Sequence, residues 1–121
     1  MSLPTEVLAQ LPTPCLVIDV EAAERNIAVA AAYFQASPAK LRPHFKAHKI
    51  TELIRRQLAA GGCVGVTCQT PYEAAVLADA GVEDILVANE TTEPVALEAL
   101  GTAARHGVTI GVLIELDLGI G

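Results

Sequence analysis

The 121-residue chain has few cationic side chains and no long apolar run. Eight Lys and Arg stand against fourteen Asp and Glu, so the formal net charge is -6, which disfavours nucleic acid or an anionic membrane as the main partner. No apolar run approaches the roughly 20 residues that a membrane-spanning helix needs, and residues 1–10 lack a basic region followed by an apolar one. We therefore expect a cytoplasmic protein whose partner is a small molecule or another protein.

Cysteine is scarce, and the glycine-rich loop of nucleotide-binding proteins is missing. Cys15, Cys63 and Cys68 are odd in number, and the last two lie in an apolar run rather than in a ligand-spaced cluster, so we expect reduced, buried thiols. His44 and His48 are four residues apart but not in a predicted helix, so no metal site is predicted there. No glycine-rich sequence follows a predicted strand and opens a helix, which argues against a Rossmann nucleotide site.

Aromatic side chains are also rare: the chain has no Trp, two Tyr and two Phe, although 52% of its residues are hydrophobic. The length suits one domain of ordinary size. Such a high aliphatic fraction in a short chain suggests apolar surface that a missing partner or a missing half covers.

Strand-like and helix-like segments alternate along the chain. Strand-like runs recur near residues 42, 64, 86 and 112, and each except the last is followed by a helical pattern. The predicted strands are 15–20, 41–47, 63–68, 84–89 and 109–121, and the predicted helices are 21–37, 50–62, 70–81 and 93–107. This α/β alternation predicts parallel β/α units. A four-stranded doubly wound sheet and the first half of an eight-stranded barrel both fit it.

Two of the predicted helices begin with capping signals. Asp19 precedes the first of them and is expected to cap it. Thr70, Pro71 and Glu73 have the spacing of a capping box with proline at the first helical position.

The stretch LRPHFKAHK, residues 41–49, gathers much of the cationic chemistry. In a strand, Arg42, His44 and Lys46 would share one face, and a parallel strand that is covered on both sides has no polar place for them. A barrel interior provides one, and Lys46 falls at the carboxyl end of the strand, where active sites of parallel α/β folds lie. Lys46 is therefore the predicted nucleophile, suited to Schiff-base chemistry. Strand alternation puts its rival Lys49 on the opposite face, and a solvated edge strand stays open as the plainer reading.

Polar residues also follow the other predicted strands directly. They are Gln69, Asn89 with Glu90, and Glu115 with Asp117. Their shared position makes them candidate residues of the site, although Asn and Asp after a strand also serve as turn residues or helix caps.

These segments together resemble a known family. TPCLVID and ERNI, then LRPHFKAHK, GVTCQTPYEAAVLADAGVEDILVANE and LIELDLGIG are similar to the N-terminal part of the D-threonine aldolase and eukaryotic-type D-serine dehydratase family. The run arginine, proline, histidine, any residue, lysine, any residue, histidine, lysine is its specific element. The resemblance extends from about residue 12 to Gly121.

The resemblance implies the alanine-racemase-like fold of type III pyridoxal-phosphate enzymes, a (β/α)8 barrel of TIM type with a β-rich C-terminal domain. Residues 1–121 would form the first half of the barrel, and residues 15–20 would pair with the β-domain, which the family carries after the barrel. Lys46 would be the Schiff-base lysine of pyridoxal 5'-phosphate. The other implied cofactor-binding residues are Arg42, His44, Gln69, Asn89 and Asp117. The family also uses a divalent metal, whose ligands would lie outside this chain, and we expect a homodimer of the full-length protein.

The implied activity is a lyase acting on a D-3-hydroxy amino acid, first of all a D-threonine-aldolase-like cleavage to glycine and an aldehyde. A D-serine-dehydratase-like ammonia-lyase and an amino-acid racemase of the same fold are the alternatives. A non-catalytic pyridoxal-phosphate-binding or truncated protein that dimerises through its open half is another. A half barrel leaves two strand edges unpaired, so we expect these 121 residues to be inactive alone.

Overall fold

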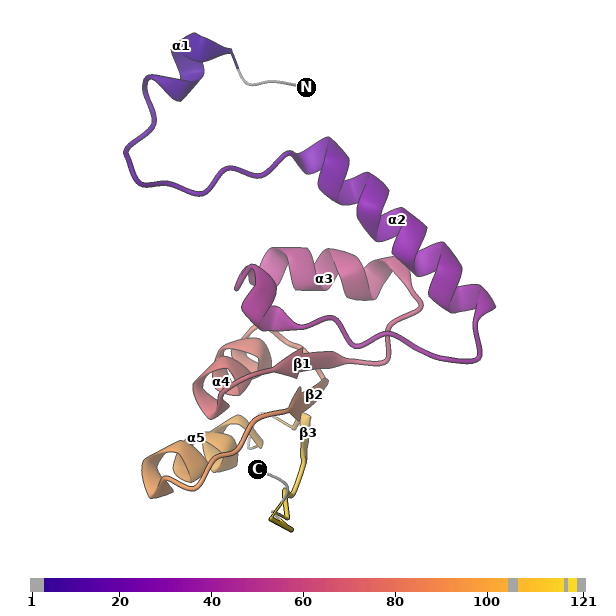
Figure 1. Ribbon diagram of the computed structural model, residues 1–121, viewed down its shortest axis with the longest axis vertical. Coiled ribbons are helices and arrows are strands. Elements are labelled where there is room, and N and C mark those ends of the chain that lie inside the picture. The colour runs from indigo at the N-terminus through magenta and orange to yellow at the C-terminus, as the bar shows by residue number, and fades with distance from the viewer. Residues whose placement is uncertain (1–3, 105–106, 117, 120–121) are drawn as a thin grey trace.

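The computed structural model describes residues 4–104, 107–116 and 118–119. Helices α4 and α5 lie beside each other on one side of a small sheet, α3 lies above them, and α2 crosses α3 and leads to the distant N-terminal segment (Figure 1). In chain order the elements are α1 (Thr5–Leu8), α2 (Val20–Ala36), the 3-10 turn η1 (Phe45–Ala47), α3 (Thr51–Ala60), β1 (Val66–Cys68), α4 (Pro71–Asp79), β2 (Asp84–Val87), α5 (Pro94–Ala104) and β3 (Thr109–Val112).

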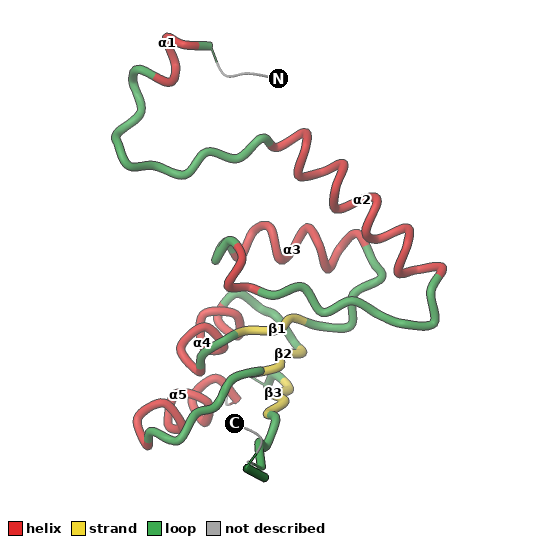
Figure 2. The backbone as a smooth tube through the Cα atoms, in the orientation of Figure 1, coloured by secondary structure: helices red, strands yellow, loops and turns green. Residues whose placement is uncertain are grey.

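The sheet has the order β1-β2-β3, and both pairings are parallel. A helix connects each pair of neighbouring strands (Figure 2), because two parallel strands need a crossover connection. The predicted parallel β/α units are therefore confirmed. The predicted capping box of α4 is confirmed as well, since the Thr70 hydroxyl accepts a hydrogen bond from the Glu73 N–H at 3.2 Å.

The predicted strand 41–47 is largely absent. It consists of two isolated parallel bridges, Leu41 to Cys63 and His44 to Thr67, and the chain then turns into η1. Pro43 is one physical reason, because proline has no N–H to donate to a ladder and only its carbonyl accepts, from the Thr67 N–H at 2.9 Å.

A bulge is the second reason. Between the two bridges, the segment 63–67 has one residue more than the segment 41–44, which is the definition of a β-bulge. Gly65 lies in it with φ 143°, and a Cβ added there would lie 2.6 Å from the Asp84 backbone oxygen and against the Arg42 guanidinium. Arg42 donates to both Asp84 carboxylate oxygens at 2.8 Å beside it. Gly65 thus leaves room for this two-pronged ion pair.

The predicted strand 15–20 is not present either. Asp19 begins α2 as predicted, accepting a hydrogen bond from the Ala22 N–H at 2.9 Å, but the residues before it form no ladder. Leu16 is 89% exposed. A strand forms only where its backbone groups find a partner, and no strand of the described residues lies beside this segment. Its pairing with a β-domain stays a prediction.

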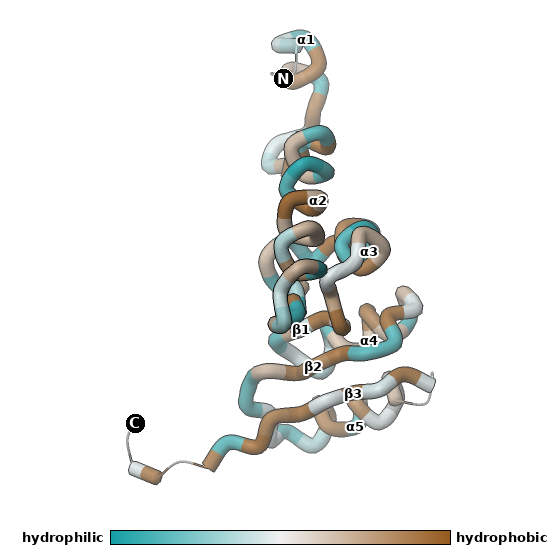
Figure 3. Tube along the Cα trace, turned by 90° about the vertical axis from the view of Figure 1, so that its right-hand side faces the viewer, coloured by the Kyte–Doolittle hydropathy of each residue, from teal (hydrophilic) through white to brown (hydrophobic). Residues whose placement is uncertain are grey.

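The hydrophobic core lies between the sheet and the helices. Ile54 of α3, Leu77 of α4 and Ile85 of β2 are fully buried in it. Because alternate residues of a strand face opposite sides, Asp84 and Leu86 face away from the helices. On that side the described chain has no covering helix (Figure 3).

The uncovered side of the sheet is arranged in layers. The register places four residues in one row, namely His44, Thr67, Leu86 and Gly111. Rows of this kind line the interior of a (β/α) barrel, so the described chain has the architecture of half a barrel. No helix in the described ranges is long and apolar enough to cross a bilayer.

Replacing Gly65 by alanine tests the role of the bulge. Gly65→Ala should destabilise the fold by roughly 1–3 kcal/mol beyond the backbone cost, because its Cβ overlaps the Asp84 backbone. Gly81→Ala is the matched control: Gly81 has φ 82° and nothing within 4 Å of an added Cβ, so it should cost only the about 1–2 kcal/mol of a left-handed backbone. Urea unfolding measures both. Equal losses would contradict the packing argument.

Candidate active site at the carboxyl edge of the sheet

Lys46 lies in the turn η1, not at the end of a strand as predicted. The turn starts at His44, whose Nδ1 accepts a hydrogen bond from the Lys46 N–H at 3.3 Å. The predicted alternation is confirmed as far as Phe45, since Pro43 and Phe45 are buried, while His44 is half-buried and Lys46 is exposed. Lys46 thus follows the bridge at His44 and lies at the carboxyl edge of the sheet, where active sites of parallel α/β folds gather.

The three lysines of the chain differ in what their ammonium groups contact. Lys40 donates to the carbonyl oxygens of Phe34 and Ser37, at 3.0 and 3.1 Å. Lys49 forms an ion pair with Glu73, with 3.0 Å between Nζ and Oε1. Within the described residues, Lys46 Nζ has neither a hydrogen bond nor an ion pair. It is the lysine with a free amine.

Glu73 is a buried carboxylate in the first turn of α4, with 8% of its surface exposed. Its Oε2 accepts a hydrogen bond from the Gln69 N–H at 2.8 Å, and its Oε1 contacts Lys49. Burial acts to raise the Glu73 pKa, but the Gln69 N–H and the Lys49 ammonium outweigh it, so the pKa is lowered. Glu73 therefore stays ionised and connects the turn after η1 to the end of β1.

Sequence reasoning had missed this link. It gave Glu73 only a capping role. It excluded Lys49 from the predicted site because strand alternation places Lys49 on the opposite face from Lys46. Lys49 is not in a strand: its φ is 55°, the one positive value outside glycine in the described chain, so alternation does not decide its direction. The available signal was a capping-box glutamate at the start of the helix that follows a predicted strand.

The two histidines of the turn act as local hydrogen-bond acceptors. His48 Nδ1 accepts from the Ile50 N–H at 3.1 Å, as His44 Nδ1 does from Lys46. An acceptor Nδ1 carries no proton, so a neutral His44 is protonated on Nε2. Burial and the nearby Lys46 charge lower the His44 pKa, against a smaller opposing effect of Glu73. His44 is therefore neutral at pH 7 and adds no positive charge beside Lys46.

Arg42 lies away from the other predicted residues. It is engaged by Asp84, the first residue of β2, and so sits towards the amino edge, opposite to the edge where Lys46 lies. The Arg42 hydrogen bond lowers the Asp84 pKa and keeps the pair ionised. The structure thus gives Arg42 a partner within the fold, and its predicted contact with a cofactor stays a prediction.

Gln69 and Asn89 follow two neighbouring strands at the carboxyl edge. Cys68 pairs with Val87, and the Ala88 N–H donates to the Cys68 carbonyl at 3.1 Å, so the two polar residues leave the sheet side by side. Both are exposed. The predicted site residue Asp117 lies outside the described residues.

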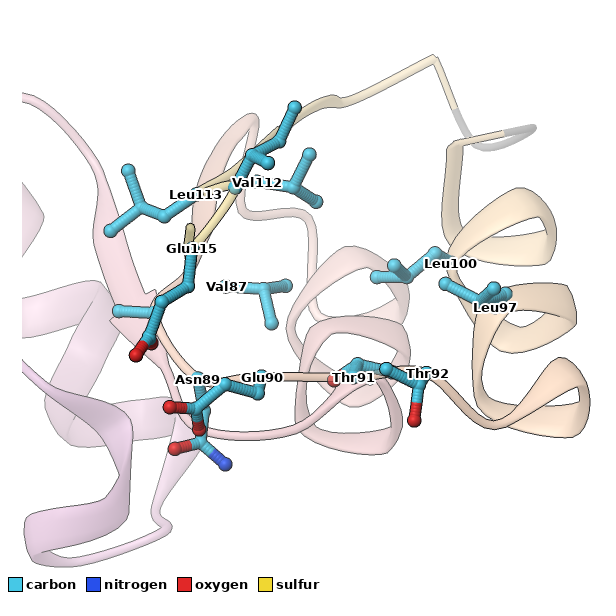
Figure 4. Close-up of a pocket in the computed structure, with 12 residues that line it drawn as sticks. Val87, Asn89, Glu90, Thr91, Thr92, Leu97, Leu100, Val112, Leu113 and Glu115 are labelled. Atoms are coloured by element: carbon cyan, nitrogen blue, oxygen red, sulfur yellow. The ribbon is translucent and has the colours of Figure 1, made fainter. Parts of the chain in front are cut away.

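A pocket of about 740 Å³ lies beside this edge (Figure 4). Asn89, Glu90 and Glu115 stand at one end of it, and Leu97 and Leu100 of α5 stand at the other. The Glu90 carboxylate accepts a hydrogen bond from Glu115, which raises the Glu115 pKa. Of the predicted site residues that the structure describes, the pocket holds Asn89, Glu90 and Glu115. It is an opening between the sheet and α5 rather than a cavity around Lys46.

The cysteines are free, and one of them differs from expectation. Cys68 is buried, and burial together with the Glu73 charge raises its pKa to about 12. Cys63 is half-buried, but Cys15 is exposed, because the segment around it has no partner; the expectation of three buried thiols is wrong there. Within the described ranges, no group of three or more His, Cys, Asp or Glu could hold a metal ion.

Comparison with known proteins gives one family. Residues 18–112 match the sequence profile described as alanine racemase, N-terminal domain. A curated relative, the 3-hydroxy-D-aspartate aldolase of Paracoccus denitrificans, is 33% identical over 93% of this chain and 35% of its own length. The chain thus spans about a third of the length of this relative.

Two solved structures have the same arrangement. The crystal structure of D-threonine aldolase from Filomicrobium marinum has a TM-score of 0.81 and 39% identity, covering 90% of this chain and 29% of that one. The D-threo-3-hydroxyaspartate dehydratase from Delftia sp. HT23 has a TM-score of 0.77 and 34% identity, covering 89% and 28%. A structure of that dehydratase is named as its metal-free form.

The buried Glu73 should make stability depend on pH. Its pKa is lowered in the folded chain, so it stabilises the fold above the unfolded pKa, and this contribution disappears as the pH falls through the folded pKa. Glu73→Gln should be about 1–2 kcal/mol less stable at pH 7, and the gap should narrow as the pH falls below the unfolded glutamate pKa of about 4.3 towards the lower folded pKa. Urea unfolding from pH 7 to 3 measures it.

The exposed Glu52, which pairs with Arg56 at 3.1 Å, supplies the control. Glu52→Gln should change stability little at any pH, because exposed ion pairs contribute little. A Glu73→Gln gap that stays constant down to pH 3 would mean that the Glu73 charge does not stabilise the fold.

Proposed function

The chain belongs to the family of the alanine racemase N-terminal domain, and on that premise we propose that it is the lysine-bearing part of a pyridoxal-phosphate-dependent lyase for D-3-hydroxy amino acids. One observation carries the proposal. Lys46 Nζ is exposed at the carboxyl edge of the parallel sheet, while Lys40 and Lys49 are engaged by other groups. A free amine at this edge is what an aldehyde cofactor requires.

The residues at the edge fit the aldehyde end of pyridoxal phosphate. Lys46 would bind it through Nζ, and neutral His44 beside it neither repels nor neutralises a charge there. Gln69 and Asn89 are exposed at the same edge and would supply amide donors and acceptors. When bound, the cofactor would supply an electron sink for the bond that breaks at the substrate Cα.

The turn η1 determines how the chain presents the Lys46 amine to an aldehyde. Lys46 must lose its ammonium proton before Nζ can attack an aldehyde. Its backbone is held by the hydrogen bond to His44 Nδ1, so the side chain starts from a fixed point. Neutral His44 carries its proton on Nε2, so this nitrogen can act as a hydrogen-bond donor beside the turn.

An aldolase is the proposed reaction: cleavage of the bond between Cα and Cβ of the D-3-hydroxy amino acid gives glycine and an aldehyde. The support is that an aldolase is matched over 93% of this chain and that a D-threonine aldolase has the same arrangement. The second candidate is a dehydratase that releases ammonia and a 2-oxo acid, because the Delftia dehydratase matches over 89% of the chain. Cytoplasmic location, a homodimer and a metal for the full-length protein remain parts of the proposal.

Reductive labelling tests the proposed lysine. The chain is mixed with pyridoxal phosphate, reduced with borohydride, and the labelled lysine is located by mass spectrometry. Lys46 should carry about tenfold more label than Lys40 or Lys49, a factor that corresponds to about 1.4 kcal/mol, because the other two ammonium groups must first give up their hydrogen bonds or ion pair.

Two variants serve as controls for the labelling. Lys46→Arg should abolish most of the label, and Lys40→Arg should leave it in place. Label spread evenly over the three lysines would show that the edge offers no preferred amine and would rule out the proposal.

A further inference from the structure

We propose that Glu73 is a positioning residue that makes Lys46, rather than Lys49, the reactive amine of the turn. It does so by holding the Lys49 ammonium and the Gln69 backbone at once. The inference rests on the proposed function in one respect, that Lys46 is the amine that meets the aldehyde.

The first support is that both oxygens of the Glu73 carboxylate have partners. Its two oxygens face two different segments, Oε1 the ammonium of Lys49 and Oε2 the N–H of Gln69. It is buried to 8% exposure, and a buried carboxylate persists only when its oxygens are paired. The chain after η1 and the end of β1 are therefore tied to one side chain at the N-terminus of α4.

The second support is the backbone of Lys49. Its φ of 55° is left-handed, which costs a residue other than glycine about 1–2 kcal/mol and persists only where its surroundings impose it. The Lys49 N–H donates to the Phe45 carbonyl at 2.8 Å, which closes the turn around Lys46. The ion pair with Glu73 holds the side-chain end of the same residue. Glu73 thus helps to maintain the closed turn.

The third support is the chemistry of two amines three residues apart. Either lysine could condense with an aldehyde, and only an unprotonated amine reacts. The Lys49 ammonium is paired with the buried Glu73 carboxylate at 3.0 Å, so Lys49 must give up this ion pair before its Nζ can attack an aldehyde. Lys46 has no such partner in the part of the chain that the structure describes, so it has no ion pair to give up.

The test compares label on the two lysines in wild type and in Glu73→Gln. The amide oxygen of Gln can still accept from the Gln69 N–H, but the charge that holds Lys49 is lost. The ratio of Lys49 label to Lys46 label, after pyridoxal phosphate and borohydride, should rise about tenfold, which corresponds to about 1.4 kcal/mol. Glu52→Gln, which removes an exposed carboxylate paired with arginine, should leave the ratio as in wild type. An unchanged ratio in Glu73→Gln overturns the inference.

Two further measurements separate selectivity from loss of structure. Label on Lys40 is the internal standard, since general unfolding would raise all three lysines together. Lys49→Arg keeps a cation for Glu73 but removes the amine, so it should preserve Lys46 labelling and its pH dependence. Loss of Lys46 labelling in this variant would contradict the positioning role.

Acetic anhydride distinguishes failure of this inference from failure of the proposed function. Without any cofactor, Lys49 should be acetylated more slowly than Lys46 in wild type, and the difference should disappear in Glu73→Gln. If Lys46 takes no pyridoxal label but this acetylation pattern holds, the proposed function is wrong and the role of Glu73 stands. If Lys46 takes the label but Lys49 acetylation does not respond to Glu73→Gln, the proposed function stands and the inference is wrong.

Discussion

The carboxyl edge of this sheet depends on one buried carboxylate. Glu73 is desolvated by α4 and the core, so its charge must be paired, and it finds its partners in the Gln69 N–H and the Lys49 ammonium. These belong to segments that no regular hydrogen-bond ladder connects at that point. The turn that carries Lys46 therefore takes its position from an ion pair as well as from the two bridges at Leu41 and His44.

The opposite edge is organised by a second ion pair. Arg42 and Asp84 meet across the bulge at Gly65, where a side chain would leave no room. The row that starts at His44 lies between the two ion pairs. One ion pair thus lies at each edge of the sheet. Lys46, whose amine has no partner in the described residues, lies at the carboxyl edge, where parallel α/β folds have their active sites.

Several elements could be predicted because local signals agree with the tertiary structure. Asp19 and Thr70 have the cap chemistry that begins a helix, and both caps are present. The expected alternation placed Arg42 and His44 on one face, and the residues between and after them, Pro43 and Phe45, are buried. The segment 15–20 looked like a strand for the same apolar reason, but a strand also needs a partner, and apolar composition cannot supply one.

The sequence alone determined the α/β alternation, the family resemblance and Lys46 as the candidate amine, because periodicity, capping residues and a motif are local properties. Only the tertiary structure decided that Lys49 is engaged by Glu73, that Arg42 pairs with Asp84 towards the far edge, and that Cys15 is exposed. These outcomes depend on contacts between residues 24 to 42 positions apart, or on the lack of such contacts, and local patterns do not encode them.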